Sequence, residues 1–252
     1  MTINAPIPKD IPALRRLWQQ AFGDTDAFLD DFFSLAFSPD RCRCVMEDGM
    51  LTAMLYWFDC ECGGQKIAYL YAVATDEAYQ NRGFCRALME HTHAHLKQSG
   101  YHAVMLVPGS RELFRFYEKL GYQTATHIRE FTCGAGASPI PLRKISAEEY
   151  AALRRQMLPE LGVIQEGAAL ALMEAQSGFY AGEDLLLTAG LADGKLLCSE
   201  LLGSADAAPG ILAAFGTTEG TFRTPGTDSP FAMFLPLSPD AHIPRYFGLA
   251  LD

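Results

Sequence analysis

Residues 69–89 read YLYAVATDEAYQNRGFCRALM, a run that changes character twice. Its apolar first part is typical of a buried strand, a polar loop follows from Asp76 to Arg82, and a helix begins at Gly83. Glycine lets the backbone approach a ligand closely, and the free N–H groups and positive dipole end of a new helix face one point. The run therefore predicts a pyrophosphate site, to which Arg82 and Arg86 would add positive charge and hydrogen-bond donors.

Helices and strands alternate on both sides of this run. Asp10 to Gly23 predict an amphipathic helix with an acidic cap, a first-turn proline and a closing glycine. A second helical stretch runs through 28–36, and the turn at 47–49 predicts a hairpin of strands 42–46 and 51–58. Further strands are expected at 67–75, 102–107 and 122–132, and further helices at 83–97 and through Tyr117 and Leu120. The pattern predicts a mixed α/β fold, with helices and strands in both halves of the chain.

The small residues from Gly134 to Pro139 are typical of a linker and predict two domains, 1–134 and 141–252. The sequence ALRR occurs at 13–16 and again at 152–155, each time in an opening helix, which indicates an internal repeat. Two unrelated α+β segments of similar helix composition are the alternative. In the second domain we expect helices at 168–175 and 207–215, a hairpin at 185–202, and strands near 222 and at 231–235.

Charge and composition exclude several classes of protein. The 252 residues carry a net charge of −10, with a pI near 5.0, and a surface of that sign repels nucleic acid and anionic lipid. Hydrophobic residues make up 49% of the chain, which is enough for a packed core. The chain shows neither a secretory signal nor a run of about 18 apolar residues, so we expect a cytoplasmic protein whose seven cysteines are reduced.

Two motifs give the sequence a family resemblance. Residues 80–85, Gln-Asn-Arg-Gly-Phe-Cys, resemble the cofactor motif of the GNAT acyltransferases, which is Arg or Gln, two variable residues, Gly, one variable residue, and Gly or Ala. Residues 116–122, Phe-Tyr-Glu-Lys-Leu-Gly-Tyr, stand where that family has its second motif. The resemblance covers about residues 7–132. The sequence departs from the family at Cys85, which replaces Gly or Ala, and at Ser110, where many relatives have Asn.

The start of the predicted helix, residues 82–89, is also similar to the enhanced-intracellular-survival aminoglycoside acetyltransferases, which have a second GNAT-like region. The chain is too short to contain their third, carrier-protein-like domain. This similarity implies a degenerate GNAT-like second domain. Its nearest counterpart of the glycine loop, 204–210, places Asp206 where a phosphate would lie, so we expect no cofactor site there and assign that half to an acceptor wall or a homodimer surface.

The resemblance implies acetyl-CoA, or another short acyl-CoA, as the cofactor. The strand before the loop would open so that the backbone of Val73, Ala74 and Thr75 holds the thioester and pantetheine. The diphosphate would lie on the loop and the first helical turn, formed by Asn81, Arg82, Gly83, Phe84, Cys85 and Arg86.

Acyl transfer needs a base for the ammonium, a proton donor for the departing thiolate and stabilisation of the carbonyl oxygen. The resemblance gives the proton-donor role to Tyr117. Helical spacing alone favours an aromatic residue packed under the sheet with its hydroxyl at the surface. No base stands out from the sequence, and we consider six candidates: Tyr69, Tyr71, Asp59, Glu61, Glu112 and the terminal Asp252.

The resemblance and the acidic surface together imply an N-acyltransferase acting on a cationic amine of a small molecule or peptide, bound between the two halves. The alternative is a catalytically silent GNAT-like module that binds acyl-CoA or serves as a scaffold. A dinucleotide-dependent enzyme is disfavoured because the second and third glycines of its fingerprint are missing.

Two patterns of metal-ligand residues are weak. Cys42 and Cys44 alternate on one predicted strand, and a turn at 48–49 would pair them with Leu55 and Ala53 rather than with the second cysteine pair at 60 and 62. Three histidines, at 91, 93 and 95, share one predicted helix, and the first and third of them lie on one face. An exposed helix surface explains the histidines, and we expect no metal site.

Overall fold

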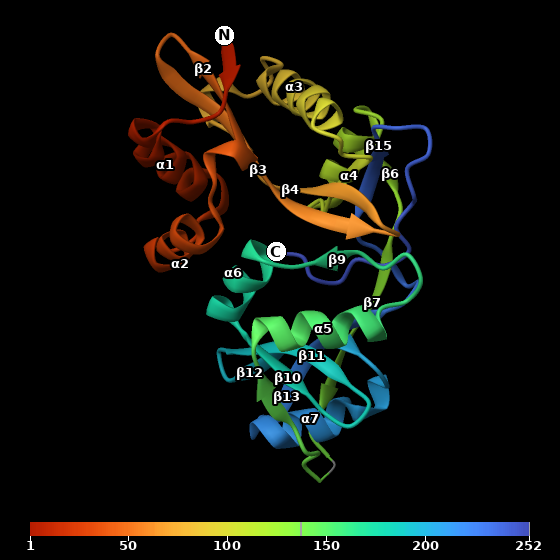
Figure 1. Ribbon diagram of the computed structural model, residues 1–252. Coiled ribbons are helices and arrows are strands. Elements are labelled where there is room, and N and C mark those ends of the chain that lie inside the picture. Colours follow the sequence, from red (N-terminus) through yellow and green to blue (C-terminus); the bar gives the residue numbers. More distant parts are fainter. Residues whose placement is uncertain (137, 252) are drawn as a thin grey trace.

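The computed structural model describes residues 1–136 and 138–251, which form two β-sheets with helices packed on them (Figure 1). The first sheet has eight strands in the order β1-β2-β3-β4-β5-β15-β6, with β9 paired to β3. Its strands are β1 Thr2–Asn4, β2 Cys42–Glu47, β3 Met50–Cys62, β4 Gln65–Thr75, β5 Ala103–Leu106, β6 Gln123–Thr124, β9 Ile164–Gln165 and β15 Met233–Pro236. Within this sheet the β4–β5 pair is parallel, and the other pairs are antiparallel.

Helices cover both faces of the first sheet. On one face lie α1 Ile11–Phe22 and α2 Asp26–Asp31, which continues as a π-helical turn at Phe32–Ala36; on the other lie α3 Phe84–Gln98 and α4 Arg111–Glu118. Strand β3 shows why, because from Ala53 to Phe58 the side chains on both of its faces are apolar and buried. Tyr56 packs with Trp18 of α1, and Trp57 belongs to the cluster that contains Leu88 of α3.

The second sheet has seven strands in the order β14-β7-β13-β12-β11-β10-β8. They are β7 His127–Gly134, β8 Arg143–Ile145, β10 Gly178–Ala181, β11 Leu186–Ala192, β12 Lys195–Leu202, β13 Glu219–Pro225 and β14 Ser229–Pro230. Helices α5 Ala147–Met157 and α6 Ala168–Gln176 lie between the two sheets, and α7 Ala208–Phe215 lies on the far side (Figure 1). One apolar cluster runs from α1 and β4 into α5, α6 and the last residues of the chain.

The two halves of the chain exchange strands. Strand β7, before the linker, pairs with β13 of the second sheet, and β15, near the end of the chain, pairs with β5 of the first. The predicted domain 1–134 therefore contributes β7 to the second sheet, and the predicted domain 141–252 contributes β9 and β15 to the first. The prediction of a single strand at 122–132 is wrong, because this segment contributes to both sheets. It is two strands, because the chain leaves the first sheet at Thr126, which binds Phe231 and Ala232, and enters the second.

Other predicted elements lie close to their observed bounds, including the opening helix, the long hairpin and the helix after the glycine loop. The predicted register of the hairpin, which paired Cys42 with Leu55 and Cys44 with Ala53, is wrong by one residue. A bulge in β3 after the turn shifts the pairing, so that Cys42 pairs with Tyr56 and Cys44 with Met54. In the described part of the chain no three His, Cys, Asp or Glu side chains are placed to hold a metal ion. No helix in that part is long and apolar enough to cross a membrane.

Candidate functional site

Strand β4 opens away from its parallel neighbour. It pairs with β3 along its length, but with β5 only from Ile67 to Tyr69. A bulge interrupts the β3–β4 ladder at the same level, and Ala72 has a φ of +48°, in the left-handed region that residues with a side chain seldom adopt. Beyond Tyr69 no strand of the described residues lies beside one backbone edge of β4. That edge includes Val73, Ala74 and Thr75, the residues predicted to hold the thioester arm.

The loop after β4 ends in a helix start whose donors have no acceptor within the helix. Asn81 and Gly83 are left-handed, with φ of +59° and +84°, and Gly83 is the N-cap of α3. The N–H of Ala87 donates to Gly83 O at 3.0 Å, so the preceding N–H groups of the first turn, from Phe84 to Arg86, lie outside the intrahelical ladder. A β-carbon at Gly83 would meet no atom within 4 Å, so the position needs glycine for its backbone angle alone.

The two arginines of this loop are exposed and differently held. The guanidinium of Arg82 lies 4.9 Å from the ring centre of Tyr79 and 5.1 Å from that of Phe84, which orients it by cation–π contact. Arg86 forms an exposed pair with Glu90, four residues on, at 3.7 Å. Both side chains stand at the α3 N-terminus, as predicted.

Cys85 packs against the core under α3 and is only partly exposed. Burial raises the pKa of its thiol to about 11, against opposing effects of the neighbouring Thr75 hydroxyl and Arg86. The residue that departs from the family motif is therefore a neutral thiol at neutral pH. Its side chain fits among apolar neighbours, so the larger residue is accommodated beneath the loop.

Tyr117 lies on α4, where Ser110 caps the first turn by accepting from the N–H of Leu113 at 3.4 Å. Its side chain is 6% exposed, and burial raises its pKa well above the ordinary value, so the phenol stays protonated at neutral pH. The ring packs edge-on against Tyr122, whose hydroxyl lies 2.7 Å from Nε2 of His93. Tyr117 is thus a protonated phenol whose ring is fixed by packing in the protein interior.

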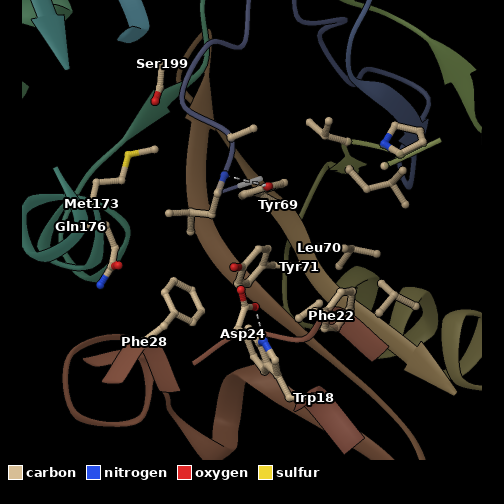
Figure 2. Close-up of a pocket in the computed structure, with 18 of the residues that line it drawn as sticks. Trp18, Phe22, Asp24, Phe28, Tyr69, Leu70, Tyr71, Met173, Gln176 and Ser199 are labelled. Atoms are coloured by element: carbon tan, nitrogen blue, oxygen red, sulfur yellow. Dashed lines mark hydrogen bonds between the residues drawn. The ribbon is translucent and has the colours of Figure 1, made fainter. Parts of the chain in front are cut away.

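A cavity of about 600 Å³ joins the opened strand to the second sheet (Figure 2). It reaches between β4 and the segment after β5, and of the predicted site residues Val73 and Tyr117 line it. Ala74, Thr75 and residues 81–86 do not line the cavity and lie further along the strand and loop. The far wall comes from α6, β11, β12 and the last residues of the chain, namely Met173, Gln176, Ser177, Gly190, Leu191, Ala192, Leu197, Ser199, Ala250 and Leu251.

Asp24 is the charged side chain of the cavity wall within the described part of the chain, and sequence reasoning missed it. It follows the glycine that ends α1, and its Oδ2 accepts a hydrogen bond from the indole N–H of Trp18 at 2.7 Å. The ring of Trp18 lies 5.5 Å from that of Tyr71, and both rings line the cavity (Figure 2). A carboxylate beside two aromatic rings is a site suited to a cation.

The predicted candidates for the base separate into two groups. Tyr69 and Tyr71 line the cavity. Asp59 lies elsewhere, bound to Tyr101 and Arg41, and Glu61 lies near Arg155 at 3.9 Å. Glu112, on the first turn of α4, is also outside the cavity wall, and Asp252 lies outside the described residues.

Comparison with known proteins identifies a family for the first half of the chain. Residues 3–125 match the family model described as an acetyltransferase (GNAT) domain. No curated protein sequence matches the chain significantly. Among solved structures, a GCN5-related N-acetyltransferase from Kribbella flavida aligns with 94% of this chain and 72% of its own, at 17% identity and a TM-score of 0.69.

Two further structures share the architecture. Eis1 from Mycobacterium abscessus aligns with 94% of this chain and 74% of its own, at 13% identity and a TM-score of 0.68. A putative acetyltransferase from Pyrococcus horikoshii aligns with 98% and 92%, at 17% identity and a TM-score of 0.67. The shared fold thus extends over both sheets. Residues 3–125 are therefore a domain of the GNAT acetyltransferase family.

Proposed function

We propose that the protein is an acyl-CoA-dependent N-acyltransferase that moves an acetyl or another short acyl group to an amine. The observation that carries this proposal is the opened strand β4, which presents a free backbone edge to a cavity that also contains a protonated phenol, Tyr117, and a carboxylate, Asp24. These features supply the elements that amide formation from a thioester requires. The GNAT domain at 3–125 supports the same reaction class.

The cofactor fits the residues predicted for it. The left-handed Gly83 and the first-turn N–H groups of α3 form an anion site, with Arg82 and Arg86 adding positive charge. The thioester arm would run along the free edge of β4 at Val73 to Thr75, in the manner of an added strand. The second half has no counterpart of this loop, and we assign it to the wall of the acceptor cavity.

The reaction needs three proton transfers. Asp24 would take one proton from the acceptor ammonium, whose pKa is roughly 10, and the freed amine could then attack the thioester carbonyl carbon. As the N–C bond forms and the C–S bond breaks, Tyr117 would give its phenolic proton to the departing sulfur. The nitrogen would then lose its second proton, which returns through water to the Tyr117 phenolate, and Asp24 would release its proton to water. Backbone N–H groups at the β4 bulge would stabilise the charge on the carbonyl oxygen.

Cofactor binding is tested by calorimetric titration of coenzyme A into the protein and into Gly83→Glu, which places a carboxylate at the anion site. The matched control is Gly64→Glu, because Gly64 is also left-handed, with a φ of +78° and open space around it, but lies in the turn at the other end of β4. We expect binding by the wild type and the control and none by Gly83→Glu. Equal binding by all three would contradict the proposed site.

Transfer itself is tested by release of free thiol from acetyl-CoA with a panel of amines. We expect Tyr117→Phe to lower kcat about 100-fold with unchanged coenzyme A affinity, since it removes the general acid. Asp24→Asn should raise the amine KM at least tenfold, because a hydrogen bond to a charged group contributes about 1.5–3 kcal/mol. Coenzyme A binding without turnover of any amine would identify a silent binding module instead.

A further inference from the structure

The mouth of the cavity is unusually apolar for an exposed surface. Nine large hydrophobic side chains are exposed in the described part of the chain, and four of them line this cavity. They form an apolar rim of Phe22, Leu113, Leu191 and Leu197, exposed by 46, 39, 59 and 49%. Exposed apolar groups gathered at one cavity are typical of a binding surface. Because the four come from α1, α4 and the β11–β12 hairpin, elements of both sheets and their helices contribute to the rim.

Leu197 faces the cavity by register as well as by contact. It is paired with Gly190, so no side chain stands opposite it, and Ser199, two residues on, is on the same face of β12. Gly190 and Ser199 also line the cavity. Strand β12 thus turns Leu197 toward the space that an acceptor would occupy.

The polar groups of the cavity are mostly committed to other partners. The Gln176 amide donates to Asp31 at 2.8 Å, and the Ser177 hydroxyl bonds Met173 O and the Thr188 hydroxyl, each at 3.1 Å. The indole N–H of Trp18 is used by Asp24. A ligand with many hydroxyl groups would bury them with few partners, and each unsatisfied group costs about 1–3 kcal/mol.

We propose, building on the transferase function above, that the acceptor is a primary monoamine carrying an aromatic or aliphatic body, selected by the apolar rim. Asp24, held by the indole N–H of Trp18, takes the single ammonium, and the ring of Tyr71 lies beside it (Figure 2). The body extends over Phe22, whose ring lies 5.8 Å from Trp18, toward Leu197 on the opposite wall. The first sheet thus binds the reacting ammonium group, and the second sheet contacts the apolar body of the acceptor.

The affinity test does not depend on turnover. Phenethylamine, hexylamine, hexamethylenediamine and glucosamine are titrated by calorimetry into the protein, with and without coenzyme A. We expect the two apolar monoamines to bind at least tenfold more tightly than the diamine and the amino sugar. Equal or tighter binding of the diamine or of glucosamine, or no binding of the apolar monoamines, overturns the inference. Binding of the apolar monoamines without acyl transfer supports it and refutes the transferase instead.

Variants of the rim give the second test. In the double variant Leu113→Ser, Leu197→Ser, the Kd of phenethylamine should rise about tenfold, because about half of each leucine side chain loses its apolar contact. Glucosamine and coenzyme A affinities should not change. The matched control is Ile243→Ser, a leucine-sized side chain that is 60% exposed and lies outside the cavity wall. An equal effect of the control, or an unchanged phenethylamine Kd in the double variant, contradicts selection by the rim.

Discussion

Replacing His93 with glutamine should flatten the dependence of stability on pH between 7 and 5. Burial lowers the pKa of this imidazole from its ordinary value of 6.5 to about 4, and its Nε2 lies 2.7 Å from the Tyr122 hydroxyl. Between these two pKa values the unfolded chain binds a proton that the folded chain does not, so stability falls as the pH falls below about 6.5. The full loss, reached below about pH 4, is about 3 kcal/mol.

The expected magnitude at pH 5 follows from the same two values. There the unfolded imidazole is almost fully protonated and the folded one almost fully neutral, which costs the wild type about 2 kcal/mol relative to pH 7. His93→Gln retains a side chain able to bond Tyr122 but has no group that titrates. Its free energy of unfolding should therefore change by about 2 kcal/mol less than that of the wild type between the two pH values.

The measurement is urea unfolding at pH 7 and pH 5, and the quantity compared is the difference between the two free energies of unfolding for each protein. His91→Gln is the control, because His91 is exposed on the same helix. Groups other than the substituted imidazole cancel in this comparison. A His93→Gln protein with the same pH dependence as the wild type would refute the assignment of a buried neutral imidazole beside Tyr122.

Two further predictions concern backbone angle and buried charge. Gly83→Ala should cost about 1–2 kcal/mol of stability, since alanine must adopt a φ of +84°, whereas Gly109→Ala, also in open space but without a positive φ, should be neutral by urea unfolding. Glu200→Gln should destabilise by about 3–5 kcal/mol, because it leaves the guanidinium of Arg154 fully buried without its carboxylate, and a Tm drop of about 10 °C would show it. Glu160→Gln, in the exposed ion pair with Arg245, should leave the Tm nearly unaltered. An equal drop in Tm for the two variants would contradict the larger cost expected for breaking the buried pair.

Short sequence motifs could identify those site residues whose positions depend on neighbouring residues in the chain. Gly83 follows from a strand–loop–helix pattern within twenty residues, and Tyr117 from a short motif on one helix. Gly83 is the N-cap of α3, and Tyr117 lines the cavity. The bulge that offsets Cys42 has no comparable local signal, since the turn residues Asp48 and Gly49 set the register correctly only up to Met46.

The places of Asp24 and Leu197 in the site could not be predicted from the sequence, for a physical reason. Asp24 enters the site because α1 packs under β4 through Trp18, so its place depends on contacts between segments about 50 residues apart. Leu197 depends on the docking of the second sheet. The prediction at 122–132 failed likewise, because the turn at Thr126 is fixed by residues about 105 positions later in the chain.

The exchange of strands explains how one cavity can draw on both sheets. Strands β15 and β9 extend the first sheet beside β5 and β3, and β7 extends the second beside β13, so in both sheets hydrogen-bonded ladders join residues from the two sides of the linker. Leu197 therefore stands on a wall fixed relative to Tyr117, although the two residues belong to different sheets. Because the 81–86 loop lies outside the cavity wall, substitutions on β11 and β12 can change which amine binds without altering the anion site. A change in acceptor preference through the second sheet, at constant coenzyme A affinity, is the behaviour this arrangement requires.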